Sequence, residues 1–599
     1  MIRNLTMALR FAAGLAAACL AVAGLCAAAA AQDAPEGPDP GRPDPGRPNI
    51  VLIILDDVGL TDLGVTGGEA ATPAMDALAG EGVVFASFNT APMCAPSRAM
   101  MLTGVVSHDA GVANLPETTP DALTGLRGYE GRLTRRAATL AEHLRPAGYQ
   151  NFIAGKWHLG HDADSLPTAR GFDRSFVLDA SGADNWRDRP YLAYYDRAEW
   201  WADGAPARRP DGEFSSTFLV NQMLDYLGTR DARRPFFAVI GFQAVHIPVQ
   251  APREIVEAYD GVYDSGWDVL AARRHAGAAA RGLIPADAAA PATPEGLRDW
   301  DGLDDETRAF VTASMEVNAA MLDATDREIA RLVASLREEG VYDNTLFLIV
   351  SDNGPEHNRP DLHRGTEFWL DLEGYSRDPQ TLGGPDTYAW IGTEWAKAAA
   401  GHGAFFKMHA GSGGMNVPLI VSGPGVSRRG VSRDFAFATD LVPTVLEIAG
   451  AAPFPADIAP AGRSLAPILA APGPAPRLPA TPVGMEAGGH AALFLGPLKL
   501  ARSTAPHGDG AWRLYDWTVD PGETNDLAQS RPEEFQQMRE AWRTFAALHA
   551  IQPVAPDYTP AGLLAQRTYA RQARKYAPWG LGGLLVLGAL AWLIFRRRA

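Results

Sequence analysis

Cysteine is scarce in this chain, whose 599 residues include only Cys19, Cys26 and Cys94. The first two lie in an apolar N-terminal stretch that has the features of a removable signal, so an exported protein would keep Cys94 alone. A lone thiol is a liability in an oxidising compartment, because it is open to oxidation and unwanted pairing. A specific purpose is therefore expected for Cys94.

Positive charge is also in short supply. Lys and Arg total 53 against 70 Asp and Glu, which gives a formal net charge of -17. Nucleic acids bind to clustered Lys and Arg, so this balance argues against a nucleic-acid partner. Apolar residues make up 47% and charged residues 21%, which permits a large core. The length suits one large domain and a smaller one.

The N-terminal segment 1–32 has the pattern of a signal peptide. Arg3 and Arg10 precede an apolar run over 11–31, and small residues near its end suit cleavage close to Gln32. The alternative is a retained N-terminal membrane anchor. The pattern predicts export to the periplasm or the cell surface.

A second apolar run lies over 579–595 and is followed by three arginines. Its length is at the short end of the roughly 17–25 residues that a membrane helix needs. We expect the arginines to stay cytoplasmic and the run to anchor the exported body to the membrane. The alternative is a sorting tail that is cut off. Residues 551–578 before it are predicted to form a stalk.

The folded body is predicted to begin after a linker over 33–48, which repeats PDPGR and is too rich in proline to pack a core. Three short apolar, β-branched runs are typical of buried strands of a parallel sheet, and a helical pattern fills 310–340. Strands that alternate with helices predict an α/β fold. The three runs are NIVLIIL (49–55), FFAVIGF (236–242) and TLFLIV (345–350).

An Ala- and Pro-rich stretch over 470–482 is predicted to separate the large domain, 49–470, from a smaller one, 483–550. The smaller domain is predicted to be α+β, with a helix over 533–550. Its strands are expected in ALFLGPLKLAR (492–502) and WRLYDW (512–517).

Polar residues follow each of the three predicted strands. Asp56 and Asp57 follow the first, His246 the second, and Asp352 and Asn353 the third. Ligands collect at the carboxyl ends of strands in open α/β sheets, so these side chains are expected to converge. Three crowded carboxylates need a cation, and Asp and Asn oxygens suit Ca²⁺ or Mg²⁺ better than Zn²⁺. The alternative for any one Asp is a helix cap or a turn.

Cations are expected near the same edge. GKWHLG places Lys156 and His158 two residues apart, on one side of an extended segment. Lys407 precedes a Gly-rich turn, and Arg98 lies in the segment of the lone cysteine. With His246, these side chains suit a phosphate or sulfate ester, whose charge is spread over its oxygens. The alternative for Lys156 and His158 is an exposed basic loop, and Lys407 alone would indicate nothing.

The segment CAPSRAMMLTG (94–104) matches the C-x-P-S-R-x-x-x-L-T-G signature of the sulfatase family. The chain resembles this family over about residues 49–550 and looks most like bacterial arylsulfatases. The resemblance implies an alkaline-phosphatase-like α/β fold, with a large mixed or parallel sheet flanked by helices and a smaller C-terminal α+β subdomain. Further matching stretches are TPAMDALAGEGVVF (72–85), GKWHLG (155–160), SDNG (351–354), DLVPTVLEIAGA (440–451), GRSL (462–465) and LYDWTVDPGETNDLA (514–528).

The resemblance also implies an activity, the hydrolysis of an aryl or carbohydrate sulfate to an alcohol and sulfate. In this family the signature cysteine is oxidised to formylglycine, an aldehyde, by a formylglycine-generating enzyme or an equivalent maturase. Taken motif by motif, the implied roles are Ca²⁺ or Mg²⁺ binding by Asp56, Asp57, Asp352 and Asn353, the nucleophile from Cys94, its stabilisation by Arg98, sulfate binding by Lys156, release of sulfate by His158, and leaving-group assistance by His246 and Lys407.

One position departs from the family pattern. A Glu usually precedes the Gly-Gly pair after the late lysine, but here Ser412 does. His402 and His409 flank that lysine, and solvated loop positions are favoured for both over a place at the substrate mouth.

Two alternatives to a sulfatase stay open at this point. One is a phosphonate or phosphate monoester hydrolase on the same fold, and the other is a non-catalytic sulfatase-like binding protein. Substrate specificity is expected on loops, chiefly over 162–208, 259–301 and 358–404.

Overall fold

The structure, a computed structural model, describes residues 46–471, 473 and 475–596, and only the backbone of 578–591 and 593–596. The predicted signal peptide and most of the predicted linker lie outside the described residues. From Arg47 onward the chain packs as one unit.

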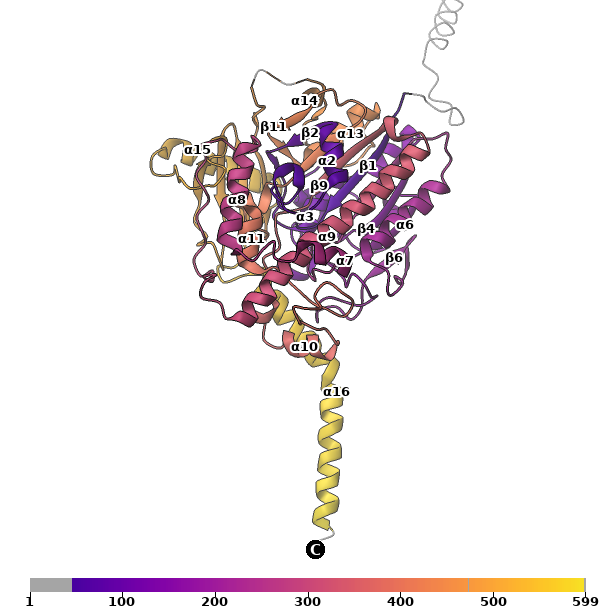
Figure 1. The fold of residues 1–599 in the computed structure, drawn as a ribbon, viewed down its shortest axis with the longest axis vertical. Coiled ribbons are helices and arrows are strands. Elements are labelled where there is room, and N and C mark those ends of the chain that lie inside the picture. The colour runs from indigo at the N-terminus through magenta and orange to yellow at the C-terminus, as the bar shows by residue number, and fades with distance from the viewer. Residues whose placement is uncertain (1–45, 472, 474, 597–599) are drawn as a thin grey trace, which may run out of the picture. The chain divides into compact units, whose positions relative to one another are not determined.

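A ten-stranded sheet runs through this unit (Figure 1). Its middle strand, β1, pairs in parallel with β8 and β9, the two other strands that the apolar runs predicted. Because β10 runs antiparallel to β9 and β2, the sheet is mixed. The order across the sheet is β11 (Gly430–Ser432), β2 (Gly82–Phe85), β10 (Leu419–Ser422), β9 (Thr345–Ser351), β1 (Asn49–Leu55), β8 (Phe236–Gly241), β4 (Gln150–Lys156), β5 (Arg174–Leu178), β6 (Trp200–Ala202) and β7 (Ala205–Pro206).

Both faces of the sheet are covered, which explains why the central strands are apolar at every position. Val51 and Ile53 belong to one buried cluster, and Ile50 and Leu52 belong to another, because successive strand residues point to opposite faces. Figure 1 shows α6 and α9 lying along the sheet. The helices of the first cluster include α2 (Pro73–Gly80), α6 (Ser215–Gly228), α8 (Gly266–Ala280), α9 (Asp305–Glu338) and α11 (Gly392–Ala400). Those of the second include α3 (Cys94–Thr103), α5 (Leu140–Leu144), α13 (Leu441–Ala449) and α14 (Ala466–Ala470).

The predicted α/β class is confirmed, and one helix boundary differs from the prediction. The pattern over 310–340 predicted a helix start at residue 310, but α9 begins at Asp305. Asp304 caps it, since its side chain accepts a hydrogen bond of 2.7 Å from the backbone N–H of Thr307. The short helices not yet named are α4 (Ser107–Ala110), α7 (Arg253–Val256), α10 (Thr366–Leu372) and α12 (Ser412–Met415).

A smaller antiparallel sheet and one helix follow, as the sequence predicted for the C-terminal α+β subdomain. The helix α15 (Pro532–Leu548) packs Met538, Trp542 and Phe545 into a separate apolar cluster with this sheet. The strands, in order, are β13 (Val483–Ala487), β14 (His490–Leu495), β15 (Leu498–Arg502) and β16 (Arg513–Asp516).

The helix α16 (Pro560–Arg596) occupies the range predicted as a stalk and a membrane segment. Its first turns contact the body, where Arg567 donates a hydrogen bond of 2.9 Å to the carbonyl of Glu117. No helix among the described residues is long and apolar enough to cross a membrane. Apart from Trp592, the side chains of 579–595 lie outside the described residues, so the structure gives no support to the predicted anchor.

Candidate active site

The carboxyl ends of three central strands meet at one edge of the large sheet. Asp56 and Asp57 follow β1 directly. Asp352 and Asn353 follow β9 directly, because this strand extends to Ser351, one residue beyond the predicted run. The backbone N–H of Asp57 lies 3.4 Å from a carboxylate oxygen of Asp352. His246 comes from the loop after β8. All five side chains are buried, so the convergence expected from the sequence is observed.

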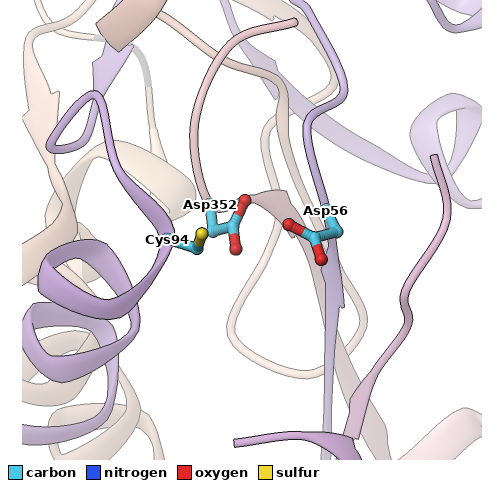
Figure 2. A group of neighbouring side chains, drawn as sticks. All are labelled: Asp56, Cys94 and Asp352. Atoms are coloured by element: carbon cyan, nitrogen blue, oxygen red, sulfur yellow. The ribbon is translucent and has the colours of Figure 1, made fainter. Parts of the chain in front are cut away.

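Cys94 is the first residue of α3 and is only 1% exposed. Its sulfur and one oxygen each of Asp56 and Asp352 lie within 4.8 Å of one another. Figure 2 shows the Cys94 side chain beside the Asp352 carboxylate, with Asp56 on the far side of Asp352. A helix N-terminus carries partial positive charge, so α3 favours an anionic group at this position.

Two cations bind the carboxylates nearest Cys94. The Nε of Arg98 donates to Asp352 at 2.7 Å, and the Nζ of Lys156 donates to Asp56 at 2.6 Å. The burial of Cys94 would raise the pKa of its thiol, but the positive charges of Lys156 and Lys407 and a hydrogen bond with His158 together outweigh burial, so the pKa is lowered. The position of Cys94 is therefore electropositive, which suits an anion in spite of the carboxylates.

Lys407 lies on the other side of the site. Its Nζ lies 2.8 Å from the carboxylate of Asp57 and 2.8 Å from that of Glu356. Burial would lower the pKa of Lys407, yet the two carboxylates raise it well above its usual value. The Nε2 of His246 lies 3.7 Å from Glu356. Lys407 is therefore held as a cation by two acidic groups.

His246 has the opposite protonation preference. Burial and the charge of Lys407 lower its pKa well below the usual value, so the ring is neutral. Its Nδ1 lies 2.7 Å from the carbonyl oxygen of Ile247, which can only accept, so Nδ1 carries the proton. Nε2 is therefore an unprotonated acceptor that faces the site.

His158 contacts a residue that the sequence gave no reason to select. Its Nε2 lies 3.2 Å from the carboxylate of Glu117. Burial would lower the pKa of His158, but the charge of Glu117 and the contacts with Cys94 together outweigh burial, and the pKa rises to about 9. Burial would raise the pKa of Glu117, but the charge of His158 and hydrogen bonds to the carboxylate together bring it down to about 2. The two residues form a buried ion pair at neutral pH.

The carboxylates of the site are not fully compensated by these cations. Burial, followed by the charge of Asp352, raises the pKa of Asp56 to about 6. Burial also raises the pKa of Asp57 well above its usual value, although Lys407 opposes it. Burial would raise the pKa of Asp352 as well, but the charges of Arg98, Lys156 and Lys407 together outweigh burial and the pKa is lowered. Additional positive charge here would stabilise the ionised forms.

A hard divalent cation fits these residues. One carboxylate oxygen of Asp56 and the amide oxygen of Asn353 are buried and make no hydrogen bond with the described residues. Unpaired buried oxygens are costly, and a cation would satisfy both. The donor set of carboxylates and an amide is the one that Ca²⁺ and Mg²⁺ prefer. The acidic cluster can therefore bind a divalent metal.

The structure brings together all ten predicted site residues and adds two acidic residues that the prediction did not include. Glu356 follows Asn353 by three positions, so its place in SDNGPE was a usable signal. Glu117 lies in a 3₁₀ turn over Pro116–Thr118 with no recognisable pattern around it. The ten residues are Asp56, Asp57, Cys94, Arg98, Lys156, His158, His246, Asp352, Asn353 and Lys407.

Ser412, which stands where the family usually has a glutamate, contacts a glutamate from the smaller subdomain. The backbone N–H and the hydroxyl of Ser412 donate to one carboxylate oxygen of Glu523, at 2.9 and 2.7 Å. Lys499 binds the same oxygen at 2.6 Å. A glutamate from a distant part of the chain therefore holds the loop after Lys407.

The solvated positions favoured for His402 and His409 are wrong. Both side chains are buried, and the ring of His409 packs against that of His490 in the smaller sheet instead of facing water. The Nε2 of His402 lies 2.8 Å from the side-chain oxygen of Asn416. The Nδ1 of His409 lies 3.0 Å from the carbonyl oxygen of Lys407.

Comparison with known proteins agrees with this geometry. Residues 48–451 match the family model described as Sulfatase. The chain belongs to the sulfatase family. The matched range contains all ten site residues, so the match covers the chemistry as well as the sheet.

This sulfatase is 32% identical over 531 residues to an uncharacterized sulfatase of Schizosaccharomyces pombe, with 85% of this chain and 95% of the relative covered. It is 33% identical over 415 residues to an arylsulfatase of Klebsiella aerogenes, with 68% of this chain and 87% of the relative covered. The solved PsFucS1 sulfatase from Pseudoalteromonas sp. shares the fold, with a TM-score of 0.55, 20% identity, and coverage of 84% of this chain and 90% of that chain.

These findings establish the class of reaction. The protein is a sulfatase, an enzyme that hydrolyses sulfate esters. The predicted alkaline-phosphatase-like fold is confirmed by the sulfatase structures that share it. The phosphonate or phosphate hydrolase and the non-catalytic binding protein are not favoured.

Proposed function

We propose that this sulfatase cleaves a sulfate monoester with a formylglycine derived from Cys94 as its nucleophile. The observation that carries the proposal is the place of Cys94, at the N-terminus of α3 and among the cations of the site. Sulfatases in general use a formylglycine and a divalent metal. The partner implied is a formylglycine-generating enzyme or an equivalent maturase, because the conversion of a thiol to an aldehyde is an oxidation that needs an external oxidant.

The chain's own residues provide a complete set of proton positions. As a hydrated aldehyde, residue 94 would offer one hydroxyl to attack sulfur and a second whose deprotonation expels sulfate. Lys156 and Lys407 would bind the sulfate oxygens. His158 would take the proton of the second hydroxyl, because its side chain contacts residue 94. The carboxylate of Glu117 contacts the same ring.

Lys407 is the better proton donor to the departing alcohol. Its pKa is raised, so it carries a proton throughout the neutral range. His246 has its only proton on Nδ1, bound to a backbone carbonyl, and its free Nε2 can accept but not donate. His246 would therefore orient the ester or a water molecule, and Lys407 would protonate the alcohol.

Asp56, Asp57, Asp352 and Asn353 are proposed to hold Ca²⁺, with Mg²⁺ as the alternative. When bound, the ion would lower the pKa of the attacking hydroxyl and orient it. The unpaired oxygens of Asp56 and Asn353 support the proposal. Metal analysis checks it, since the double variant Asp57→Ala, Asp352→Ala should retain no stoichiometric cation, and full occupancy there would contradict the assignment.

The decisive experiment pairs mass spectrometry of the Cys94 peptide with steady-state turnover of phenyl sulfate and phenyl phosphate. We expect sulfate turnover in proportion to the fraction of aldehyde, and little phosphate turnover. Cys94→Ser should stall after one turnover, because it lacks the second hydroxyl, and Cys94→Ala should bind without reacting. Sustained turnover by protein whose Cys94 is wholly unmodified would rule the mechanism out.

Export is proposed from the sequence of 1–32, which lies outside the described residues. Attachment through 579–595, or its removal as a sorting tail, stays a prediction. Cell fractionation, combined with mass measurement of both ends of the mature protein, tests export, membrane attachment and tail removal together. Recovery of the intact chain from the cytosol would contradict export.

A further inference from the structure

A pocket of about 300 Å³ opens directly above the proposed nucleophile. Cys94, His246, Glu356 and Lys407 form its floor together with Glu117. The pocket therefore offers a sulfate ester a route to Cys94, with the alcohol part of the ester in the space above the floor.

The walls above that floor are mostly apolar. One wall is α10, with Phe368, Trp369 and Leu372, and the opposite wall is the start of α16, with Leu564 and Tyr569. Three further apolar side chains join the two helices around the floor. These are Leu115, Leu192 and Ile247.

The wall provided by α16 is fixed to the body rather than lying loosely over it. Arg567 donates hydrogen bonds to the carbonyls of Glu117 and Thr119, at 2.9 and 2.6 Å. Just before the helix, the hydroxyl of Tyr558 donates to the carbonyl of Thr118 at 2.7 Å. The same turn carries Glu117 of the floor, so α16 is attached next to the reaction chemistry.

The mouth of the pocket exposes large apolar side chains to water. Phe368 is 68% exposed, Leu372 is 61% exposed and Tyr569 is 50% exposed. Apolar groups gathered at the mouth of a site are typical of a surface that a ligand covers. Outside the floor, Arg364 is the only Lys, Arg, Asp or Glu among the described residues of the pocket.

We propose that the substrate is the sulfate ester of a large apolar alcohol, whose body lies between α10 and the first turns of α16. The inference rests on the proposed function and adds the class of leaving group. A sulfated carbohydrate brings several hydroxyls that each need a partner when buried. Polar side chains such as Asn358, Thr568 and Gln572 also line the pocket, but most of its lining surface is apolar. Leu564, Phe368 and Trp369 become specificity-determining residues.

A series of 4-alkylphenyl sulfates tests the proposal on the full-length, aldehyde-bearing enzyme, at concentrations below micelle formation. The alkyl group leaves the reactivity of the phenol nearly constant, so kcat/KM reports binding of the chain. We expect a rise of about two- to fourfold per methylene, or about thirtyfold and more from methyl to hexyl. The same enzyme should hydrolyse glucosamine 6-sulfate far more slowly than phenyl sulfate.

Neighbouring leucines on α16 provide a matched pair of variants. Leu564→Gln introduces a polar group into the wall and should reduce the hexyl-to-methyl ratio about fivefold or more, by loss of apolar contact. Leu563 does not line the pocket, so Leu563→Gln should leave the ratio as in the parent enzyme. Phe368→Ser on the opposite wall should act like Leu564→Gln.

The outcomes separate this inference from the proposed function. Turnover of phenyl sulfate with a hexyl-to-methyl ratio near one, or faster hydrolysis of the carbohydrate sulfate, would overturn the inference and leave the function standing. Failure of aldehyde-bearing enzyme to hydrolyse any sulfate would overturn the function. Equal effects of Leu564→Gln and Leu563→Gln on the ratio would remove α16 from the binding wall.

Discussion

Glu117 and His158 show how one buried carboxylate sets the protonation state of an imidazole beside the proposed nucleophile. The pKa of His158 is about 9, because the charge of Glu117 and then the contact with Cys94 outweigh burial. At neutral pH most of this histidine is an imidazolium. In the aldehyde form the contribution of the thiol is absent, and Glu117 remains the charge that raises the pKa of His158, which gains the ability to accept a proton as the pH rises.

Glu117→Gln is expected to move the rising limb of kcat to lower pH. The amide carries no charge, so the pKa of His158 falls and the neutral base forms earlier, by about one to two pH units. The measurement is kcat for phenyl sulfate between about pH 6 and pH 10.

Tyr195→Phe is the control, since it removes a hydrogen bond of 3.0 Å to Glu117 but keeps the carboxylate. Its limb should stay close to that of the parent enzyme. A limb that does not move in Glu117→Gln would mean that another group limits the release of sulfate.

At the residue scale, the sequence predicted which side chains converge at the site, but not the acidic residues that contact them. Asp56, Asp352 and Cys94 could be selected because each follows a recognisable strand or motif. Glu117 could not, because its importance arises from a contact with His158, 41 positions away, that exists only after folding. Local patterns carry no information about such contacts.

At the scale of elements, the helices α3 and α13 each end at a glycine in the left-handed conformation, but the two glycines differ in how closely other residues pack around them. Gly104 follows α3 with φ of 71°, and Gly450 follows α13 with φ of 58°. A Cβ at Gly104 would lie 2.9 Å from a side-chain atom of Val442 and 3.0 Å from one of Pro460, whereas a Cβ at Gly450 would meet nothing within 4 Å. The helix of Cys94 is therefore closely packed at its far end.

Gly104→Ala is expected to destabilise more than Gly450→Ala. Both pay for a left-handed residue, about 1–2 kcal/mol, and Gly104→Ala adds overpacking of about 1–3 kcal/mol. The measurement is the free energy of unfolding in urea. Equal losses would mean that α13 moves aside freely, and α3 would then be less rigidly held than its packing indicates.

Elements with strong local patterns were predictable, and their partners were not. The apolar run at 49–55 coincides with β1, because a strand covered on both faces is apolar at every position. The stretch 551–578 predicted a stalk, but Arg567 in it contacts Thr119, 448 positions earlier. Of the three loops predicted to carry specificity, 259–301 supplies no residue to the pocket.

At the scale of the whole molecule, three histidines join the large domain to the smaller sheet. His409 follows Lys407, His490 begins β14, and His507 lies in the loop after β15. Ring centroids of His409 and His490 lie 5.0 Å apart, and those of His409 and His507 lie 5.5 Å apart. Burial, then the charge of a neighbouring histidine, lowers the pKa of both His409 and His490 well below the usual value.

Acid is therefore expected to destabilise this junction. Below about pH 6.5 the unfolded chain binds protons that the neutral folded histidines do not, so stability is present above that pH and is lost as the pH falls. Each of His409 and His490 contributes up to about 1.4 kcal/mol per pH unit in this range. Urea unfolding at several values between about pH 7 and pH 5 measures the loss.

His490→Gln keeps a polar side chain beside Thr504 and removes one titrating group, so its stability should depend less steeply on pH. A variant with the same slope as the parent protein would assign the acid sensitivity to other groups. Arg502 also lies near His490 and adds to the lowering of its pKa.

The pocket wall formed by α16 lies near the end of the chain, which bears on how the substrate range of such enzymes can evolve. Every residue assigned to the reaction lies within 48–451, the range that matches the family, whereas the wall formed by α16 begins at Pro560. Recombination or mutation confined to the distal coding region could alter the α16 wall, and so the range of accepted alcohols, while leaving the reaction chemistry and the α10 wall untouched. Enzymes descended from one ancestral gene could in this way come to accept different sulfate esters without any change in their catalytic residues.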